Sequence, residues 1–225
     1  MKNDRGWFGS PAANRIRVKI CGITNRIDAV AAIECGADAV GFNLHRGSER
    51  FVDLAEARGW IENLPREVCR VAVMVNPSLE ELFRVATLRL FDLLQLHGEE
   101  APEFCSVLAN AGICFAKAIP VTGDQSLANL PSFHTAFLIL DSAVGGRFGG
   151  TGQTFSWPLA SHFVKANKKL KVVLAGGLTP ENVSAAVSEV RPFGVDVTSG
   201  VEISGHRKDR DRIKAFVEAV RSFRF

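Results

Sequence analysis

The stretch Leu174–Asn182, LAGGLTPEN, decides the fold and supplies the first candidate site. The apolar run Val172–Ala175 predicts a buried strand, and two glycines follow it directly. Thr179 is expected to cap a helix that has Pro180 at its first position. Backbone N–H groups at a glycine turn and at a helix N-terminus bind anions. The order of strand, glycine turn and helix therefore predicts a phosphate site.

A second strand end with a glycine follows further along the chain. The run Val195–Thr198 leads directly into Ser199 and Gly200. A single glycine pair is compatible with a tight turn alone, whereas two consecutive strand ends can share one phosphate. The candidate phosphate-binding residues are therefore Gly176, Gly177, Ser199 and Gly200.

Short apolar runs alternate with helical patterns eight times along the chain, which predicts a parallel sheet buried on both faces. The expected strands are 18–21, 39–42, 71–75, 93–96, 113–119, 137–140, 172–175 and 195–198. Eight such units in 225 residues favour an α/β fold, a single-domain (β/α)8 TIM barrel. An open doubly wound sheet is the alternative, but its glycine-rich loop usually follows the first strand. We expect a loose N-terminal arm over residues 1–15 and the catalytic barrel domain over 16–225.

Composition and charge exclude several classes of protein. The net charge is +3 and no basic stripe interleaved with aromatic residues is present, so nucleic acid is not an expected partner. The apolar runs, such as Phe137–Leu140, are too short to span a bilayer, and residues 1–15 lack the apolar core of a signal peptide. Five scattered cysteines without paired spacing indicate reduced thiols and a cytoplasmic location. The histidines show no metal-ligand spacing, so we expect no metal.

Two residues at predicted strand ends are candidates for proton transfer. In a barrel of this kind the active site lies at the carboxyl ends of the strands. Cys21 ends the first strand beside a glycine, where a thiol of lowered pKa would serve as a base or a nucleophile; the alternative is a small buried hydrophobe. Asp141 ends the most apolar strand, where a raised pKa would suit a general acid; the alternative is a carboxylate that caps loop amides.

Four further polar residues are expected near the same strand ends. Arg50, in the loop after the second strand, offers a bidentate grip on a carboxylate, unless it is a solvated loop residue. Gln95 and His97 belong to the fourth strand end and would contact the substrate, although His97 before a glycine is also compatible with a turn. Asp196 lies inside the eighth strand, so we expect a buried orienting role.

Six ordered motifs resemble the phosphoribosylanthranilate isomerase family, whose members catalyse the third step of tryptophan synthesis from anthranilate. The motifs are KICGIT at 19–24, QLHG at 95–98, LDS at 140–142, GGTG at 149–152, LAGGLTPEN at 174–182 and GVDVTSGVE at 194–202. The resemblance runs from about Arg17 to the C-terminus. It implies a cofactor-free Amadori rearrangement of a small phosphosugar, N-(5-phosphoribosyl)anthranilate. It also implies a monomer, as is usual for family members from organisms of ordinary growth temperature.

The resemblance also assigns roles to residues. It makes Asp141 the general acid that opens the furanose ring and Cys21, as a thiolate, the general base at C2′. It places Arg50 near the anthranilate carboxylate and Asp196 in support of the catalytic geometry. The residues that it places around the phosphate are Gly176, Gly177, Ser199 and Gly200, with Gly150, Thr151 and Gly152 nearby.

Departures from the family pattern fall in the loop after the second strand. The family usually has Ser-Pro before the arginine, where this chain has Ser48 and Glu49. Loss of the proline is expected to loosen the turn, and Glu49 places a negative charge beside the binding arginine. Asn43 replaces a residue that is usually apolar.

Three rival functions would each need a sequence feature that this chain lacks. A histidine-pathway isomerase for a substrate with two phosphates would need a second glycine loop after the third strand, where the chain has Val75–Ser78 instead. An indole-glycerol-phosphate synthase would need a lysine at the end of the second or third strand. A non-catalytic binder would be expected to have a damaged acid or base, and both Cys21 and Asp141 are present.

Overall fold

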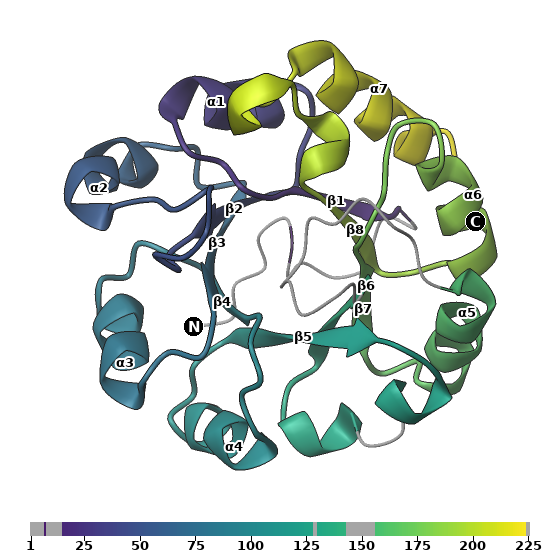
Figure 1. The fold of residues 1–225 in the computed structure, drawn as a ribbon, viewed down its shortest axis with the longest axis horizontal. Helices are drawn as coiled ribbons and strands as arrows, with labels where there is room; N and C mark the ends of the chain where they lie inside the picture. The colour runs from purple at the N-terminus through teal and green to yellow at the C-terminus, as the bar shows by residue number, and fades with distance from the viewer. Residues whose placement is uncertain (1–6, 8–14, 128–129, 143–155, 224–225) are drawn as a thin grey trace.

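The computed structural model of the protein is a closed barrel of eight parallel strands (Figure 1). It describes residues 7, 15–127, 130–142 and 156–223. The strands are β1 Arg17–Ile20, β2 Ala39–Asn43, β3 Cys69–Met74, β4 Leu93–Leu96, β5 Phe115–Val121, β6 Phe137–Ser142, β7 Lys171–Leu174 and β8 Gly194–Val197. Each strand pairs with the next in sequence, and β8 closes the ring on β1 with Lys19 opposite Asp196. The predicted TIM barrel is confirmed.

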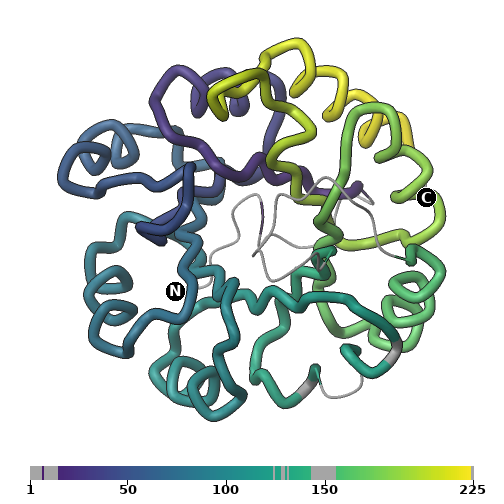
Figure 2. The backbone as a smooth tube through the Cα atoms, viewed as in Figure 1, coloured from purple at the N-terminus to yellow at the C-terminus, as the bar shows by residue number. Residues whose placement is uncertain are grey.

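Helices form a ring around the barrel because their apolar faces cover the outward side of the strands (Figure 1). They are α1 Arg26–Glu34, α2 Leu54–Glu62, α3 Leu79–Thr87, α4 Pro102–Asn110, α5 Trp157–Ala166, α6 Val183–Val190 and α7 Arg210–Arg221. The chain runs once around the ring from purple to yellow, so its first and last units lie side by side (Figure 2).

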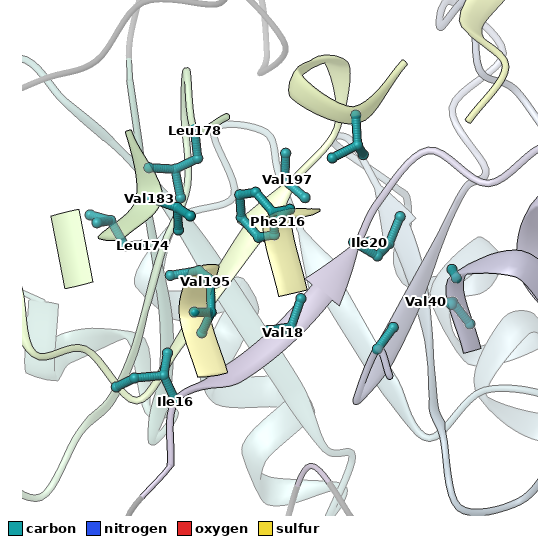
Figure 3. Packing of buried hydrophobic residues seen from close by; sticks show 14 of the residues in the cluster. Ile16, Val18, Ile20, Val40, Leu174, Leu178, Val183, Val195, Val197 and Phe216 are labelled. Atoms are coloured by element: carbon teal, nitrogen blue, oxygen red, sulfur yellow. The ribbon is translucent and has the colours of Figure 1, made fainter. Parts of the chain in front are cut away.

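Alternation along the strands separates two apolar regions, one outside the barrel and one in its lumen. Outside it, Val18 of β1 and Val195 of β8 pack near Phe216 of α7 (Figure 3). The intervening residues on these two strands, Lys19 and Asp196, therefore face the lumen.

Trp7 closes the amino end of the lumen. Its side chain is 2% exposed and packs with residues from the amino ends of four strands, Ala39, Cys69, Leu93 and Phe137. Its ring lies edge-on to Phe193, with the ring centroids 5.8 Å apart. The expected loose arm over residues 1–15 thus contains at least one residue that is built into the barrel.

Two connections differ from the sequence-based expectation. In the described part of the segment between β5 and β6, the chain forms two short 3-10 helices, η1 Asp124–Leu127 and η2 Leu130–Phe133, where one short helical piece was expected. After β7, α6 is capped by Asn182, not by Thr179. The Asn182 Oδ1 accepts a hydrogen bond from the Thr179 backbone N–H at 2.8 Å. Thr179 and Pro180 therefore form a turn ahead of the helix.

Candidate active site

A pocket at the carboxyl ends of the strands gathers most of the residues predicted for the site. Its lining includes Cys21, Arg50, His97, Asp141, Gly176, Gly177, Asp196, Ser199 and Gly200. These residues follow or end β1, β2, β4, β6, β7 and β8, so closure of the barrel brings together side chains that are far apart in sequence. The predicted Gly150, Thr151 and Gly152 lie outside the described residues.

The backbone after β7 approaches β6 so closely that only glycine fits at position 176. Gly176 has a φ of +83°, which side chains rarely adopt. An added Cβ would lie 2.3 Å from Ser142 Oγ and 2.7 Å from Asp141 Oδ1. The Gly176 backbone is thus packed directly against the end of β6.

The residues of the turns after β7 and β8 line the same pocket, and their backbone amides are candidates for binding an anion. The N–H groups of Gly176, Gly177, Ser199 and Gly200 have no hydrogen-bond acceptor among the described residues. Asn182 fixes the first of these two turns, because its Nδ2 donates to the Gly177 carbonyl at 2.9 Å. Ser199 and Gly200 lie in the 3-10 helix η3 Ser199–Val201. Clustered free amides of this kind favour a phosphate.

Asp141 is buried and belongs to a hydrogen-bonded chain of three side chains. Gln95 Nε2 donates to His97 Nδ1 at 2.9 Å, which leaves the imidazole proton on Nε2. His97 Nε2 then donates to Asp141 Oδ2 at 3.0 Å. The other carboxyl oxygen, Oδ1, is buried and has no partner among the described residues. Asp141 therefore keeps one oriented oxygen for a ligand in the pocket.

Gln95 lies in the fourth strand, as predicted, but its side chain lies behind His97. Its side chain is fully buried and does not line the pocket. A direct contact with substrate is therefore not supported, and the structure assigns Gln95 to holding His97. His97 itself does line the pocket.

Cys21 lies close to a buried ion pair in the lumen of the barrel. Lys19 Nζ donates to Asp196 Oδ2 at 2.6 Å, and both side chains are nearly inaccessible to solvent. A Cβ added at Gly41 of β2 would lie near both Cys21 Sγ and Lys19 Nζ, so the thiol and the ammonium lie close to the same point. Burial raises the pKa of the Cys21 thiol, and the Lys19 ammonium acts in the opposite direction without cancelling it. The sequence left the pKa of Cys21 open, and in the structure it lies above the usual value because desolvation outweighs the positive charge of Lys19.

Arg50 reaches the pocket from the loop after β2 and is oriented by a carboxylate from the other end of the chain. Its Nε and Nη2 donate to the two oxygens of Glu202 at 2.8 and 2.7 Å. Lys208 Nζ lies 2.6 Å from Glu202 Oε1. The hydrogen bond to Glu202 raises the pKa of Arg50, so the guanidinium stays charged. Glu202 occupies one edge of the guanidinium, and the remaining N–H donors have no acceptor among the described residues, so they are candidates for binding an anionic group.

Comparison with known proteins identifies the family of this chain. The family model described as N-(5'phosphoribosyl)anthranilate (PRA) isomerase matches residues 18–219. The chain belongs to this isomerase family. The N-(5'-phosphoribosyl)anthranilate isomerase of Geobacter sp. (strain M21) is 43% identical over 201 residues, covering 89% of this chain and 96% of that protein.

Solved structures of isomerases superpose on the barrel. One holds monomers generated from the dimeric phosphoribosylanthranilate isomerase of Thermotoga maritima; it has a TM-score of 0.79 and 38% identity, and the match covers 92% of this chain and 100% of that one. An isomerase in complex with reduced 1-(o-carboxyphenylamino)-1-deoxyribulose 5-phosphate gives the same TM-score of 0.79, 38% identity, and coverage of 92% and 100%.

The departures from the isomerase pattern have structural counterparts in the loop after β2. Asn43 Nδ2 donates to Ser48 Oγ at 3.0 Å, and Ser48 Oγ also accepts from the Arg50 backbone N–H at 3.1 Å. These hydrogen bonds hold the loop together next to the position where the family usually has proline. Glu49 is 76% exposed, and its Oε2 lies 3.2 Å from His206 Nε2. The extra carboxylate therefore has a partner of its own beside Arg50.

Two properties of the described residues concern metal binding and membrane insertion. Within these residues, no group of three or more His, Cys, Asp or Glu side chains is arranged to hold a metal ion. None of the helices in this part of the chain has the length and hydrophobicity needed to cross a membrane.

Sequence reasoning missed Lys19 as a part of the isomerase site, and it placed Glu202 at the end of the eighth strand without giving it a role. The signal for Lys19 was present, because it lies two residues before Cys21 and so shares its face of β1. A charged residue on the inward face of a buried strand indicates a buried partner. Glu202 belongs to the quoted motif GVDVTSGVE, but only the folded structure shows that its partner is Arg50.

Proposed function

We propose that this chain isomerises N-(5'-phosphoribosyl)anthranilate to 1-(2-carboxyphenylamino)-1-deoxyribulose 5-phosphate, an Amadori rearrangement in tryptophan biosynthesis. The observation that carries the proposal is the placement of Cys21 and Asp141 on one pocket that also holds the free amides after β7 and β8. An acid, a base and an anion site are what this rearrangement of a phosphosugar requires.

The first step is ring opening. Asp141 gives a proton to the furanose ring oxygen, the bond between that oxygen and C1′ breaks, and the nitrogen lone pair forms a protonated Schiff base at C1′. His97 supports this role because it holds Asp141 Oδ2 and leaves Oδ1 for the substrate. Asp141 becomes a carboxylate in the step, which the hydrogen bond from His97 stabilises.

The second step is proton abstraction. The Cys21 thiolate takes the proton from C2′, and the electron pair of that C–H bond forms the C1′–C2′ double bond while the Schiff base is neutralised. The resulting enolamine tautomerises to the ketone. Cys21 and Asp141 have opposite protonation requirements, so the two groups need different environments.

The two ends of the substrate are bound by different elements. We assign the phosphate to the amides of Gly176, Gly177, Ser199 and Gly200, with Gly150, Thr151 and Gly152 as further candidates. We assign the anthranilate carboxylate to Arg50, whose guanidinium is held in place by Glu202. We assign Asp196, which also lines the pocket, to supporting the catalytic geometry through its ion pair with Lys19.

The test is the decay of substrate fluorescence with purified protein and freshly generated substrate in the presence of EDTA. Fast decay supports the isomerase and excludes a required dissociable metal. Cys21→Ala and Asp141→Asn should each lower kcat by at least about 100-fold, the usual contribution of a general acid or base. No decay with folded protein would refute the substrate, and the two-phosphate aminoaldose of the histidine pathway would be tested next.

The assembly and location of the protein stay predictions. The Thermotoga maritima isomerase is described as dimeric. For this chain we keep the sequence-based prediction of a monomer, and light scattering coupled to gel filtration tests it. A cytoplasmic location is tested by fractionation of the source cells.

A further inference from the structure

A buried ammonium ion lies close to the proposed base. The Lys19 side chain is 1% exposed, and its Nζ lies 2.6 Å from Asp196 Oδ2. The ammonium also attracts the Cys21 side chain electrostatically, so its charge acts on both a carboxylate and a thiol. Lysine is rarely buried unless it is paired. Lys19 is thus paired with Asp196, and its charge lies close to a proposed catalytic group.

Gly41 of the neighbouring strand β2 leaves space for the side chains of Lys19 and Cys21. A Cβ added at Gly41 of β2 would lie 2.7 Å from Cys21 Sγ and 3.2 Å from Lys19 Nζ. The thiol and the ammonium therefore share the niche left by the missing side chain. Any other residue at position 41 would force the two groups out of it.

The charges near Cys21 come from two strands and two connecting segments. Lys19 of β1, Lys208 and Arg50 present positive charge, while Asp196 of β8 presents negative charge. Lys208 and Arg50 are both engaged by Glu202, at 2.6 Å and 2.7 Å. Lys19 is the positive group that shares the space beside Gly41 with the thiol, so it is the natural counter-ion of a thiolate in this position.

We propose that Lys19 is a positioning residue for proton abstraction, in which its ammonium holds the Cys21 thiolate as a counter-ion while Asp196 anchors the ammonium. This inference rests on the proposed role of Cys21 as the general base. Lys19 keeps its protons throughout: its pKa is raised, because attraction to Asp196 and Cys21 outweighs the opposing effect of burial. The proton from C2′ therefore stays on Cys21 Sγ, and Lys19 contributes charge and orientation only.

The test measures Cys21 directly, without substrate. The rate of Cys21 alkylation by iodoacetamide is followed against pH, with the modified peptide identified by mass spectrometry, because alkylation reports the thiolate fraction. Lys19→Met should lower the rate at neutral pH at least tenfold and shift the profile to higher pH. Asp196→Asn should shift it to lower pH, because it removes a negative charge near the thiol while Lys19 stays. A purely structural role for the pair predicts shifts in the same direction for both variants.

Lys117→Met is the matched control. Lys117 is also a buried lysine with a carboxylate partner, Glu100, at 2.9 Å, but it faces the outer side of β5 and donates to the Gly98 carbonyl. Its replacement removes a buried charge of the same kind without touching Cys21. The alkylation profile of Lys117→Met should match that of the parent protein.

A double variant covers the case in which Lys19→Met does not fold, since it leaves Asp196 buried without a counter-ion. Lys19→Met with Asp196→Asn removes both charges and should fold with a slow, high-pH alkylation profile. A parental profile in either Lys19 variant would overturn the inference. If the parent protein lacks isomerase activity while the Lys19 variants shift the profile, the proposed function fails and the counter-ion role stands.

Discussion

His97 Nε2 donates to Asp141 Oδ2 at 3.0 Å, and this hydrogen bond joins the end of β4 to the end of β6. Gln95 fixes the imidazole from behind by donating to Nδ1. The carboxylate is thereby held with Oδ1 next to Gly176 and free for substrate. His97 lines the pocket, but its hydrogen-bond partner in the structure is Asp141, the proposed general acid.

His97→Gln should therefore act mainly on kcat. Loss of a hydrogen bond to a charged group costs about 1.5–3 kcal/mol, which corresponds to roughly a 10- to 100-fold lower kcat. KM should change little, because the phosphate and carboxylate contacts are untouched. Steady-state kinetics from the fluorescence assay measure both. A large rise in KM with an unchanged kcat would show that His97 binds substrate and does not orient Asp141.

The contrast between His97 and Gln95 shows how far sequence reasoning reaches here. The strand pattern placed both residues at the end of β4, and the barrel rule placed that end at the active site. Which of the two faces the pocket depends on side-chain packing, which periodicity alone does not resolve. Pairs such as Arg50 with Glu202, 152 residues apart, form only after β8 closes on β1, so no local pattern contains them.

Gly176→Ala should damage both stability and activity. The position has a positive φ, and a Cβ would lie 2.4 Å from the Ser142 backbone nitrogen. The left-handed conformation alone costs about 1–2 kcal/mol for a residue other than glycine. We expect a free energy of unfolding lower by at least about 1 kcal/mol, and a kcat/KM lower by at least about tenfold because Asp141 and the phosphate amides move.

Gly59→Ala is the control for this substitution. Gly59 lies inside α2, and a Cβ there meets nothing within 4 Å. Alanine in a helix interior should raise the free energy of unfolding by about 0.5–1 kcal/mol and leave the kinetics unchanged. Equal chemical denaturation curves for Gly176→Ala and the parent would contradict the crowding seen after β7.

Glu202→Gln should raise KM through Arg50. A glutamine matches the shape of Glu202 but carries no charge and accepts through one oxygen only, so the two-bond grip on Arg50 is lost. We expect KM to rise about tenfold, equivalent to roughly 1.4 kcal/mol, with a smaller change in kcat. Glu49→Gln is the control, because Glu49 is mainly exposed and contacts His206; its KM should stay within about threefold of the parent. A parental KM in Glu202→Gln would show that Arg50 does not need this partner.

The lowered pKa of Glu202 predicts how the free energy of unfolding changes at acid pH. Burial opposes ionisation of Glu202, but the hydrogen bond from Arg50 and the charge of Lys208 outweigh it and lower the Glu202 pKa. A group with a depressed folded pKa stabilises the protein above its unfolded pKa, about 4.3 for Glu, and this contribution is lost as the pH falls through the folded pKa. Between about pH 5 and pH 3, Glu202→Gln should therefore lose less free energy of unfolding than the parent. Denaturant titrations across this range test it, and parallel losses would exclude Glu202 as a contributor.

Trp7→Ala should separate stability from catalysis. The Trp7 side chain is 2% exposed and plugs the amino end of the lumen, at the opposite end of the strands from Cys21 and Asp141. Truncation of a buried tryptophan costs about 3–5 kcal/mol, because apolar contacts are lost and a cavity is left. The free energy of unfolding should fall by this amount, while kcat and KM at a temperature where the variant is folded stay parental. Trp7→Phe, which keeps an aromatic ring against Phe193, should recover part of the loss. An unchanged denaturation midpoint in Trp7→Ala would instead support the sequence-based prediction that residues 1–15 form a loose arm.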